Sequence, residues 1–197
     1  MNLEIKTKRL ILRSWRESDL EPFAQMNADP KVMEYFPSVM SREESDQLAR
    51  MLAIKIEKTG YGFLAVSVPN VSEFIGFLGL NSIDKTTWPV HFSPAIEIGW
   101  RLAAPYWGKG YATEGAIACL KYAFEALGLH EIVSFTAEQN MPSRAVMSKI
   151  GMHYDPKGDF DHPKLPNGHR LKKCVLYRLS LAKWKELNEA GKYSCDV

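Results

Sequence analysis

Hydrophobic residues follow two spacings along this chain, and segments with the two spacings alternate. Apolar residues at every second position, or in short runs, predict strands near residues 8–15, 61–68, 74–83, 97–102, 131–137, from about 152, and 173–181. Apolar residues three and four positions apart predict helices over residues 19–28, 41–60, 111–127, 140–150 and 183–189. This order predicts one mixed α/β domain over residues 1–197, with a helical tail over 181–197 and helices on both faces of a sheet.

The second helix has the clearest boundaries in the sequence. Ser41, followed three residues later by Glu44, forms a capping box, and Gly60 ends the helix. Its apolar face is expected to contain Leu48, Met51, Leu52 and Ile56. The first helix is expected to begin at a cap formed by Ser18 or Asp19.

Residues 97–116 contain the strongest candidate for a binding site. A strand with three alternating apolar residues comes first: Ile98, Trp100 and Leu102. Gly108 and Gly110 then allow a tight turn whose N–H groups point outward, and a helix follows at once. The first N–H groups of a helix are unpaired, and its dipole is positive at the same end. The stretch therefore predicts an anion site, for which phosphate is the usual ligand.

Composition narrows the partners that need to be considered. The chain has 197 residues, a net charge of +2 and no basic run, which argues against a nucleic-acid partner. No apolar segment is long enough to span a bilayer, so no membrane partner is expected. Three distant cysteines, Cys119, Cys174 and Cys195, indicate a reducing cytoplasm without a disulfide framework. The five histidines lack the spacing of metal ligands, so no metal is expected.

Two groups of residues match the patterns of a known family. One is the loop Trp107-Gly108-Lys109-Gly110-Tyr111-Ala112, continued by Thr113-Glu114; the other is Asn140, Ser143, Lys149, Gly151 and Met152. With the order of elements, they resemble the GNAT superfamily of N-acetyltransferases, most closely the branch that acetylates the N-terminal alanine or serine of ribosomal proteins. Trp107 stands where the family usually has Gln or Arg, and Met147 where many members place a tyrosine that protonates the departing thiolate.

The resemblance implies a mixed, mostly antiparallel sheet of about seven strands, splayed between the fourth and fifth, with helices on both faces. It implies transfer of an acetyl group from acetyl-CoA, without a metal, to a primary amine by direct attack in a ternary complex. The acceptor would be a protein N-terminus or a small molecule, and the protein a cytoplasmic monomer or homodimer. Two alternatives stay open: another acyl group such as succinyl, and a CoA-binding regulatory domain without turnover.

The resemblance also assigns residues to the cofactor. N–H groups of residues 108–113 would hold the pyrophosphate, and the backbone from Trp100 to Leu102 would pair with the pantetheine arm. A bulge at Gly99 would splay the strands and donate an N–H to the thioester oxygen, unless Gly99 serves close packing only. The cofactor-binding residues are thus expected to be Gly99, Trp100, Arg101, Leu102, Trp107, Gly108, Lys109, Gly110, Tyr111, Ala112, Thr113, Asn140, Ser143 and Lys149.

Catalysis needs a base for the amine and an acid for the leaving sulfur. An α-amine titrates at about 7.7–8.0 and a lysine amine at about 10.4, so a carboxylate acting through water suits an α-amine better. Glu97, beside the expected bulge, is the candidate base, with a surface or salt-bridged carboxylate as the alternative. Ser143 is the candidate acid, by resemblance, or a capping serine of its helix, while Asn140 binds pantetheine or caps that helix.

The acceptor side is the least determined part of the site. An irregular segment contains two carboxylates and a histidine that could bind an ammonium group, although such residues are more often solvated. Three aromatic residues in other loops could shape the same pocket. These candidates are Asp159, Asp161, His162, Tyr35, Phe36 and Trp88.

Overall fold

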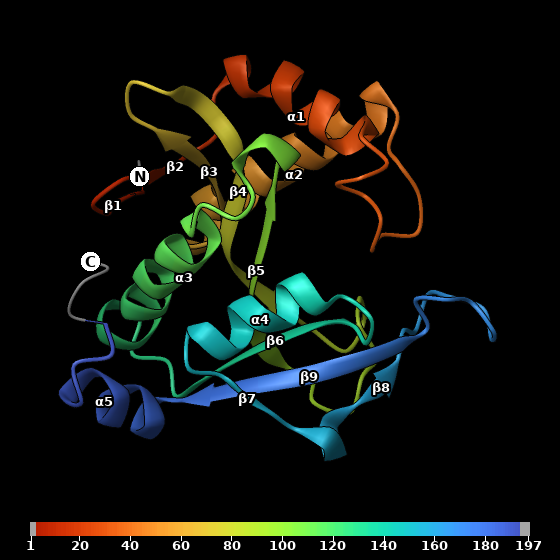
Figure 1. Ribbon diagram of the computed structural model, residues 1–197. Helices are drawn as coiled ribbons and strands as arrows, with labels where there is room; N and C mark the ends of the chain where they lie inside the picture. Colours follow the sequence, from red (N-terminus) through yellow and green to blue (C-terminus); the bar gives the residue numbers. More distant parts are fainter. Residues whose placement is uncertain (1–2, 194–197) are drawn as a thin grey trace.

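A computed structural model describes residues 3–193 of the protein (Figure 1). Within this range nine strands form one sheet, ordered β1-β2-β3-β4-β5-β6-β9-β7, with β8 paired to β9. The strands are β1 (Glu4–Lys6), β2 (Ile11–Arg13), β3 (Phe63–Val68), β4 (Ser72–Ile83), β5 (Ala95–Leu102), β6 (Glu131–Ala137), β7 (His153–Tyr154), β8 (Phe160–Asp161) and β9 (Lys173–Ser180). The short strands β1 and β8 account for the difference from the expected seven.

The sheet is antiparallel except where β5 meets β6. Strands β4 and β5 stay in register over their whole pairing, from Gly76 opposite Leu102 to Ile83 opposite Ala95. The parallel pair β5–β6 has a single register pair, Glu97 with Val133. Beyond that pair the two strands diverge, and Figure 1 shows the sheet opening between its two halves. This confirms the expected mixed sheet that is splayed at the fourth and fifth predicted strands.

Five α-helices in the described residues cover the two faces of the sheet. They are α1 (Leu20–Ala28), α2 (Arg42–Thr59), α3 (Tyr111–Lys121), α4 (Met141–Lys149) and α5 (Leu181–Glu189); a π-helical turn over Tyr122–Ala126 extends α3. Phe23 of α1 and Ala49 of α2 pack with Phe74 and Phe77 of β4 in one cluster. Residues of α3, α4 and α5 pack in a larger cluster, and Figure 1 shows α3 and α4 in front of the sheet with α2 behind it.

Local signals set several boundaries correctly. Ser41 and Glu44 form the expected capping box of α2, and Gly60 ends that helix in a left-handed conformation with a φ of 77°. Two expectations are wrong. Met51 is 67% exposed, so the buried face of α2 turns past it and uses Ala49 instead.

The other wrong expectation is the length of the strand over residues 8–15. Only β2, within this range, is a strand, and β1 precedes it. The chain turns between the two, where the N–H groups of Thr7 and Leu10 bond within the turn. Asp19 is the N-cap residue of α1, one of the two expected, but its side chain makes no cap hydrogen bond to that helix. It accepts instead from the N–H of Arg16 across a short 3₁₀ turn that precedes the helix.

The end of the predicted helical tail, residues 194–197 with Cys195, lies outside the described residues. Cys119 and Cys174 are buried free thiols. No helix within residues 3–193 has both the length and the apolar character needed to cross a membrane.

Candidate active site

The loop between β5 and α3 presents an unbroken series of backbone donors. Gly108 and Gly110 have φ angles of 72° and 81°, left-handed values that favour glycine. No acceptor within residues 3–193 binds the N–H groups of residues 108–113, which lead directly into the first turn of α3. A side chain at Gly108 would meet no atom within 4 Å, so the space above the loop is open. This geometry fits an anion.

Arg9, in the turn between β1 and β2, fixes this loop from the side. Its Nε donates to Glu114 Oε2 at 2.6 Å, and its Nη1 donates to the carbonyl of Lys109 at 2.9 Å. The Glu114 carboxylate also accepts from the Thr7 hydroxyl and the Arg9 N–H. Glu114 would otherwise repel an anion at the helix N-terminus, and the Arg9 guanidinium offsets its charge.

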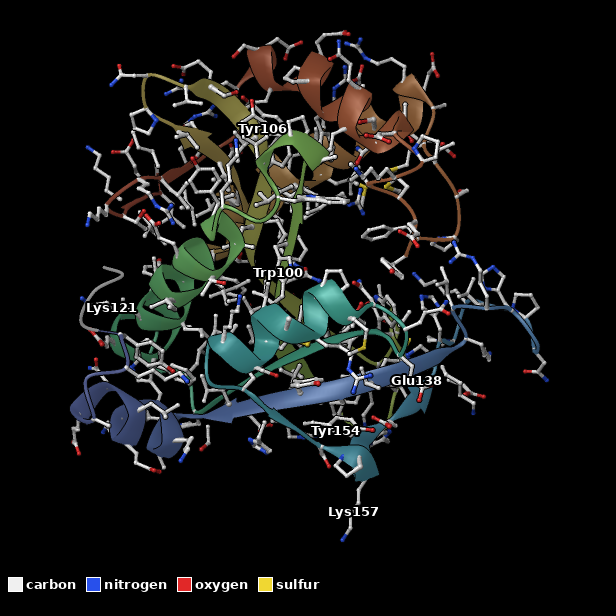
Figure 2. The ribbon with its side chains drawn as sticks, viewed as in Figure 1. Trp100, Tyr106, Lys121, Glu138, Tyr154 and Lys157 are labelled. Atoms are coloured by element: carbon white, nitrogen blue, oxygen red, sulfur yellow. The ribbon has the colours of Figure 1, made fainter. Side chains whose placement is uncertain are left out.

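The exposed edge of β5 begins where β6 diverges. The carbonyl of Ile98 faces β6, since it accepts from Ser134 Oγ at 2.9 Å, and the carbonyl of Leu102 accepts from Trp107 Nε1 at 2.7 Å. Carbonyls of alternate residues in a strand point the same way, so the N–H and C=O of Trp100 also face the opening. Figure 2 shows Trp100 between the two halves of the molecule. The indole of Trp107 closes the turn after β5.

The predicted bulge at Gly99 is wrong, because the register of β4 and β5 passes Gly99 without a shift. By the same alternation, the Gly99 N–H points toward β4, and Trp100 is the residue with a donor in the opening. A Cβ at Gly99 would lie 3.1 Å from the Phe63 ring. Close packing therefore explains why this position is a glycine.

Glu97 lies on the face of β5 that is turned toward α2. Asn81 Nδ2 donates to Glu97 Oε1 at 2.6 Å, and Lys55 Nζ from α2 donates to Asn81 Oδ1. Burial raises the pKa of Glu97 to about 7, although the Asn81 hydrogen bond and the Lys55 charge act in the opposite direction. The residue as a whole is only partly buried. A carboxyl group with a pKa near neutrality, reachable from solvent, can accept a proton at physiological pH.

The sequence also matches a known protein family. Residues 9–153, well over half of the chain, match the model described as "Acetyltransferase (GNAT) domain". The chain belongs to the GNAT acetyltransferase family. Its activity class is that of an acetyl-CoA-dependent N-acetyltransferase, which confirms the expected family, fold and enzyme class.

Relatives align over almost the whole acetyltransferase. An uncharacterized N-acetyltransferase of Bacillus subtilis is 30% identical over 92% of this chain and 99% of its own length. An FsC-acetyl coenzyme A-N(2)-transacetylase of Aspergillus fumigatus is 30% identical over 94% of this chain and 79% of its own length. The crystal structure of a GNAT-family acetyltransferase from Bacillus anthracis is 27% identical, with a TM-score of 0.74 over 91% of this chain and 99% of the other.

The ribosomal-protein branch receives weaker support. A putative ribosomal N-acetyltransferase of Bacillus subtilis is 33% identical, but over only 39% of this chain and 38% of its own length. Structures of a putative ribosomal-protein-serine acetyltransferase and a spermidine N-acetyltransferase, both from Vibrio cholerae, are 19% and 21% identical with TM-scores of 0.70 and 0.69. At such identity they share the fold alone, so the family is established and the branch is not.

Helix α4 carries the second predicted group of residues. Asn140 Oδ1 accepts from the Ser143 N–H at 3.2 Å, and Asn140 Nδ2 donates to Thr136 Oγ1 at 2.9 Å. Asn140 is therefore the helix cap, and the interpretation of Ser143 as the cap is wrong. The Ser143 hydroxyl has no hydrogen-bond partner within residues 3–193, while Met147 is buried in the core, and Lys149 is exposed in the last turn. The roles of Asn140, Ser143 and Lys149 toward acetyl-CoA stay predictions.

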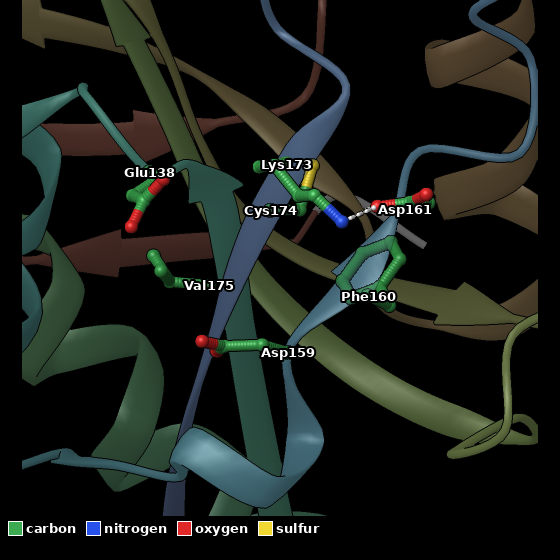
Figure 3. Close-up of a pocket in the computed structure, with 7 residues that line it drawn as sticks. All are labelled: Glu138, Asp159, Phe160, Asp161, Lys173, Cys174 and Val175. Atoms are coloured by element: carbon green, nitrogen blue, oxygen red, sulfur yellow. Dashed lines mark ion pairs between the residues drawn. The ribbon is translucent and has the colours of Figure 1, made fainter. Parts of the chain in front are cut away.

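Two predicted acceptor residues already have partners in the protein. Asp161 pairs with Lys173 at 2.7 Å, and the Asp159 carboxylate accepts from the Tyr154 hydroxyl. Both line a depression of about 330 Å³ along β8 and β9, together with Glu138 (Figure 3). Figure 2 places Glu138 well away from Trp100. The structure therefore does not bring these carboxylates beside Glu97, and local structure accounts for their interactions.

The remaining acceptor candidates fall into two places. The ring of Trp88 lies 5.0 Å from that of His162, edge to face, in the aromatic cluster over β6. Phe36 instead lies under the guanidinium of Arg101, at 3.9 Å from its ring centroid. Tyr35 precedes it in the loop between α1 and α2. Phe36 therefore contacts a residue of the exposed part of β5, and it is the candidate that the structure favours.

Sequence reasoning missed Arg9, Asn81 and Lys55. A signal for Arg9 was present, because an acidic residue, Glu114, in the first turn behind an anion-binding loop requires a nearby cation. Asn81 faces Glu97 only through the β4–β5 register, which the intervening loop conceals. Lys55 reaches the same place from α2 and has no local signal.

Replacing Arg9 with Ala is expected to raise the KM for acetyl-CoA about tenfold, because the loop loses a charge-assisted hydrogen bond and a nearby positive charge. Steady-state kinetics with varied acetyl-CoA would measure this. Arg50→Ala removes an exposed arginine from α2 and serves as the control. An unchanged KM in Arg9→Ala would show that Arg9 does not support the loop's ligand.

Proposed function

We propose that this acetyltransferase transfers the acetyl group of acetyl-CoA directly to a primary amine, with Glu97 as the general base. The observation that carries the proposal is the position of Glu97. Its carboxyl group, with a pKa near neutrality, lies on the strand whose edge faces the opening of the sheet. The acceptor is a small-molecule amine or the N-terminus of a protein.

The residues around the glycine loop fit acetyl-CoA. Six consecutive backbone N–H groups, open space above Gly108 and the guanidinium of Arg9 suit a pyrophosphate. Trp100 would pair its N–H and C=O with the pantetheine amides, as an added strand would. When bound, acetyl-CoA supplies an activated acetyl group as a thioester.

Three groups of the protein then have separate roles in the reaction. Glu97 takes a proton from the amine, directly or through a water, and so leaves a neutral nucleophile. The Trp100 N–H donates a hydrogen bond to the oxygen on which negative charge develops. Ser143 Oγ–H donates a proton to the departing sulfur and takes the proton that the attacking nitrogen loses as the amide forms, so that it ends as a hydroxyl again; the buried Met147 offers no such proton. The predicted cytoplasmic location stays a prediction.

A thiol-release assay with acetyl-CoA tests the proposal. The panel should contain N-terminal peptides, polyamines and small α-amines, each checked by mass for one added acetyl group. Turnover with at least one amine, without a covalent acetyl-enzyme on rapid quenching, is expected. An acetylated protein trapped in the absence of acceptor would contradict direct attack.

Lys55 is expected to tune the base. Removing its charge in Lys55→Met raises the pKa of Glu97 further, because the ammonium favours the carboxylate form. The ascending limb of the kcat/KM profile should move to higher pH by a few tenths of a unit to about one unit. Lys58→Met, an exposed change in the same helix, should leave the profile in place. If Lys55→Met leaves the pH profile unchanged, the Lys55 charge does not influence the pKa of the base.

A further inference from the structure

Arg101 is a cation whose contacts within residues 3–193 are all neutral. Its guanidinium lies 3.9 Å from the ring centroid of Phe36 and 5.2 Å from that of Phe77. Nη1 donates to Asn27 Oδ1 at 2.6 Å, and the buried Nε has no acceptor. The guanidinium thus contacts two aromatic rings and one amide oxygen.

The missing counter-charge distinguishes Arg101 from Arg13. Arg13 is buried, and there the fold supplies Asp19, whose two oxygens accept from both terminal nitrogens at 2.7 and 2.8 Å. No carboxylate within residues 3–193 forms an ion pair with Arg101. Burial lowers the pKa of Arg101 to about 10, so the group remains charged at neutral pH. A desolvated charge without a partner is unfavourable, which indicates that its anion comes from a ligand.

A buried polar network holds Arg101 in place. Asn27, at 0% exposure, donates from Nδ2 to Ser45 Oγ at 2.9 Å, and its backbone carbonyl accepts from the Met40 N–H. Asn27 belongs to α1, Ser45 to α2, and Met40 ends the loop that carries Phe36. Three segments therefore fix one guanidinium, which is the arrangement expected of a preorganised binding group.

Arg101 shares one face of β5 with Glu97. Gly99 separates them, and a strand rises about 3.3 Å per residue, so Arg101 lies about 7 Å along the strand from Gly99 and about 13 Å from Glu97. The Trp100 backbone faces the opening between them. An acceptor whose amine lies level with Gly99, midway along the strand between Glu97 and Arg101, can therefore reach Arg101 with a second group about 7 Å away.

We propose that Arg101 binds a carboxylate of the acceptor and selects amines that carry one about 7 Å from the reacting nitrogen. This inference rests on the proposed function. The acetyl group is uncharged, so the carboxylate belongs to the acceptor. A peptide N-terminus followed by an acidic residue has this spacing, and so does a small amino acid whose amine lies at the far end of an alkyl chain.

Two pairs of acceptors test the inference and distinguish the two sources. The first pair consists of two peptides that differ only in having Glu or Gln at the second position. The second pair consists of 6-aminohexanoic acid and its amide. A 10- to 100-fold higher kcat/KM is expected for the acid member of at least one pair, as for a charge-assisted hydrogen bond. The pair that shows it identifies a protein or a small-molecule acceptor.

The variants assign the preference to Arg101. Arg101→Met should bring the acid-to-amide ratio close to one, and Arg101→Lys should keep part of it, which guards against a folding defect. Arg16→Met, which removes an exposed arginine, should retain the full ratio. Equal rates for acid and amide in the wild type, or an unchanged ratio in Arg101→Met, would overturn the inference.

Two further outcomes separate the inference from the proposed function. If Arg101→Met selectively abolishes turnover with succinyl-CoA and leaves the acceptor ratio intact, the carboxylate belongs to the acyl group and the inference is wrong. If turnover is good but independent of carboxylates, the proposed function stands without the inference. Absence of thiol release with every amine refutes the proposed function, and the inference with it.

Discussion

Glu97→Gln is expected to lower kcat/KM by ~100-fold or more, the usual contribution of a general base. The amide keeps the shape of the side chain and its position beside Asn81, but it cannot take a proton. Thiol release under subsaturating acceptor measures the loss. The KM for acetyl-CoA should stay near its wild-type value, because Glu97 lies apart from the glycine loop in the chain and in the fold.

The pH profile separates a base from a structural carboxylate. Wild-type kcat/KM should rise through pH about 7 as Glu97 loses its proton, and Glu97→Gln should lack this limb. An acceptor whose amine titrates well below neutrality removes the acceptor's own titration from the profile. Glu57→Gln, an exposed change in α2, is the matched control. A limb near pH 7 that survives in Glu97→Gln would belong to another group and would contradict the assignment.

The same carboxyl group links stability to pH. Its folded pKa of about 7 lies above the ordinary 4.5, so its stabilising contribution is fully present below pH 4.5 and is lost as pH rises through 7. The shift corresponds to ~3 kcal/mol at most. As pH rises between these two values, the free energy of unfolding of the wild type should therefore fall relative to that of Glu97→Gln. Denaturant titration of both proteins at each pH measures the difference.

Local sequence signals were sufficient where one segment decides its own structure. The capping box of α2 and the glycine at its end needed no tertiary information, and β6 has the predicted limits. The glycine loop was also predictable, because its donors belong to a continuous strand–turn–helix segment. The expected burial of Met51 was wrong for the opposite reason. Helical spacing defines a face of the helix, but the position of the sheet decides which edge of that face is buried.

Long-range pairings set the rest of the site. Arg9 and Glu114 are 105 residues apart, and Lys55 and Asn81 are 26 residues apart. Neither contact leaves a trace in local periodicity. The bulge at Gly99 was expected because a gap in the sheet was needed there. The divergence of β6 supplies that gap instead, since the pair of Glu97 and Val133 is the only one between the two strands in the described residues.

Asp19→Ala is expected to reduce the free energy of unfolding by ~3–5 kcal/mol, the usual cost of leaving one member of a buried ion pair without its partner. The side chains of Arg13 and Asp19 are 5% and 1% exposed. Arg13 would keep only carbonyl acceptors, those of Glu73 and Ser14. Equilibrium unfolding in urea measures the change.

Two comparisons distinguish the lost partner from the lost charge itself. Asp46→Ala breaks an exposed pair with Arg42 and should cost no more than ~0.5 kcal/mol. The double variant Arg13→Met with Asp19→Leu should recover much of the loss, because two apolar side chains leave no unpaired charge. A double variant as unstable as Asp19→Ala would show that the pair is needed for more than charge balance.

The ion pair also reaches the acceptor side. Asp19 directly precedes α1 and joins that end of the helix to β2, and Asn27 near the other end positions Arg101. If α1 shifts in Asp19→Ala, the acid preference of the folded enzyme should fall while the KM for acetyl-CoA, set by the loop at α3, should change little. A parallel loss of both would instead mean that the variant loosens the whole sheet, since the two binding regions share β5.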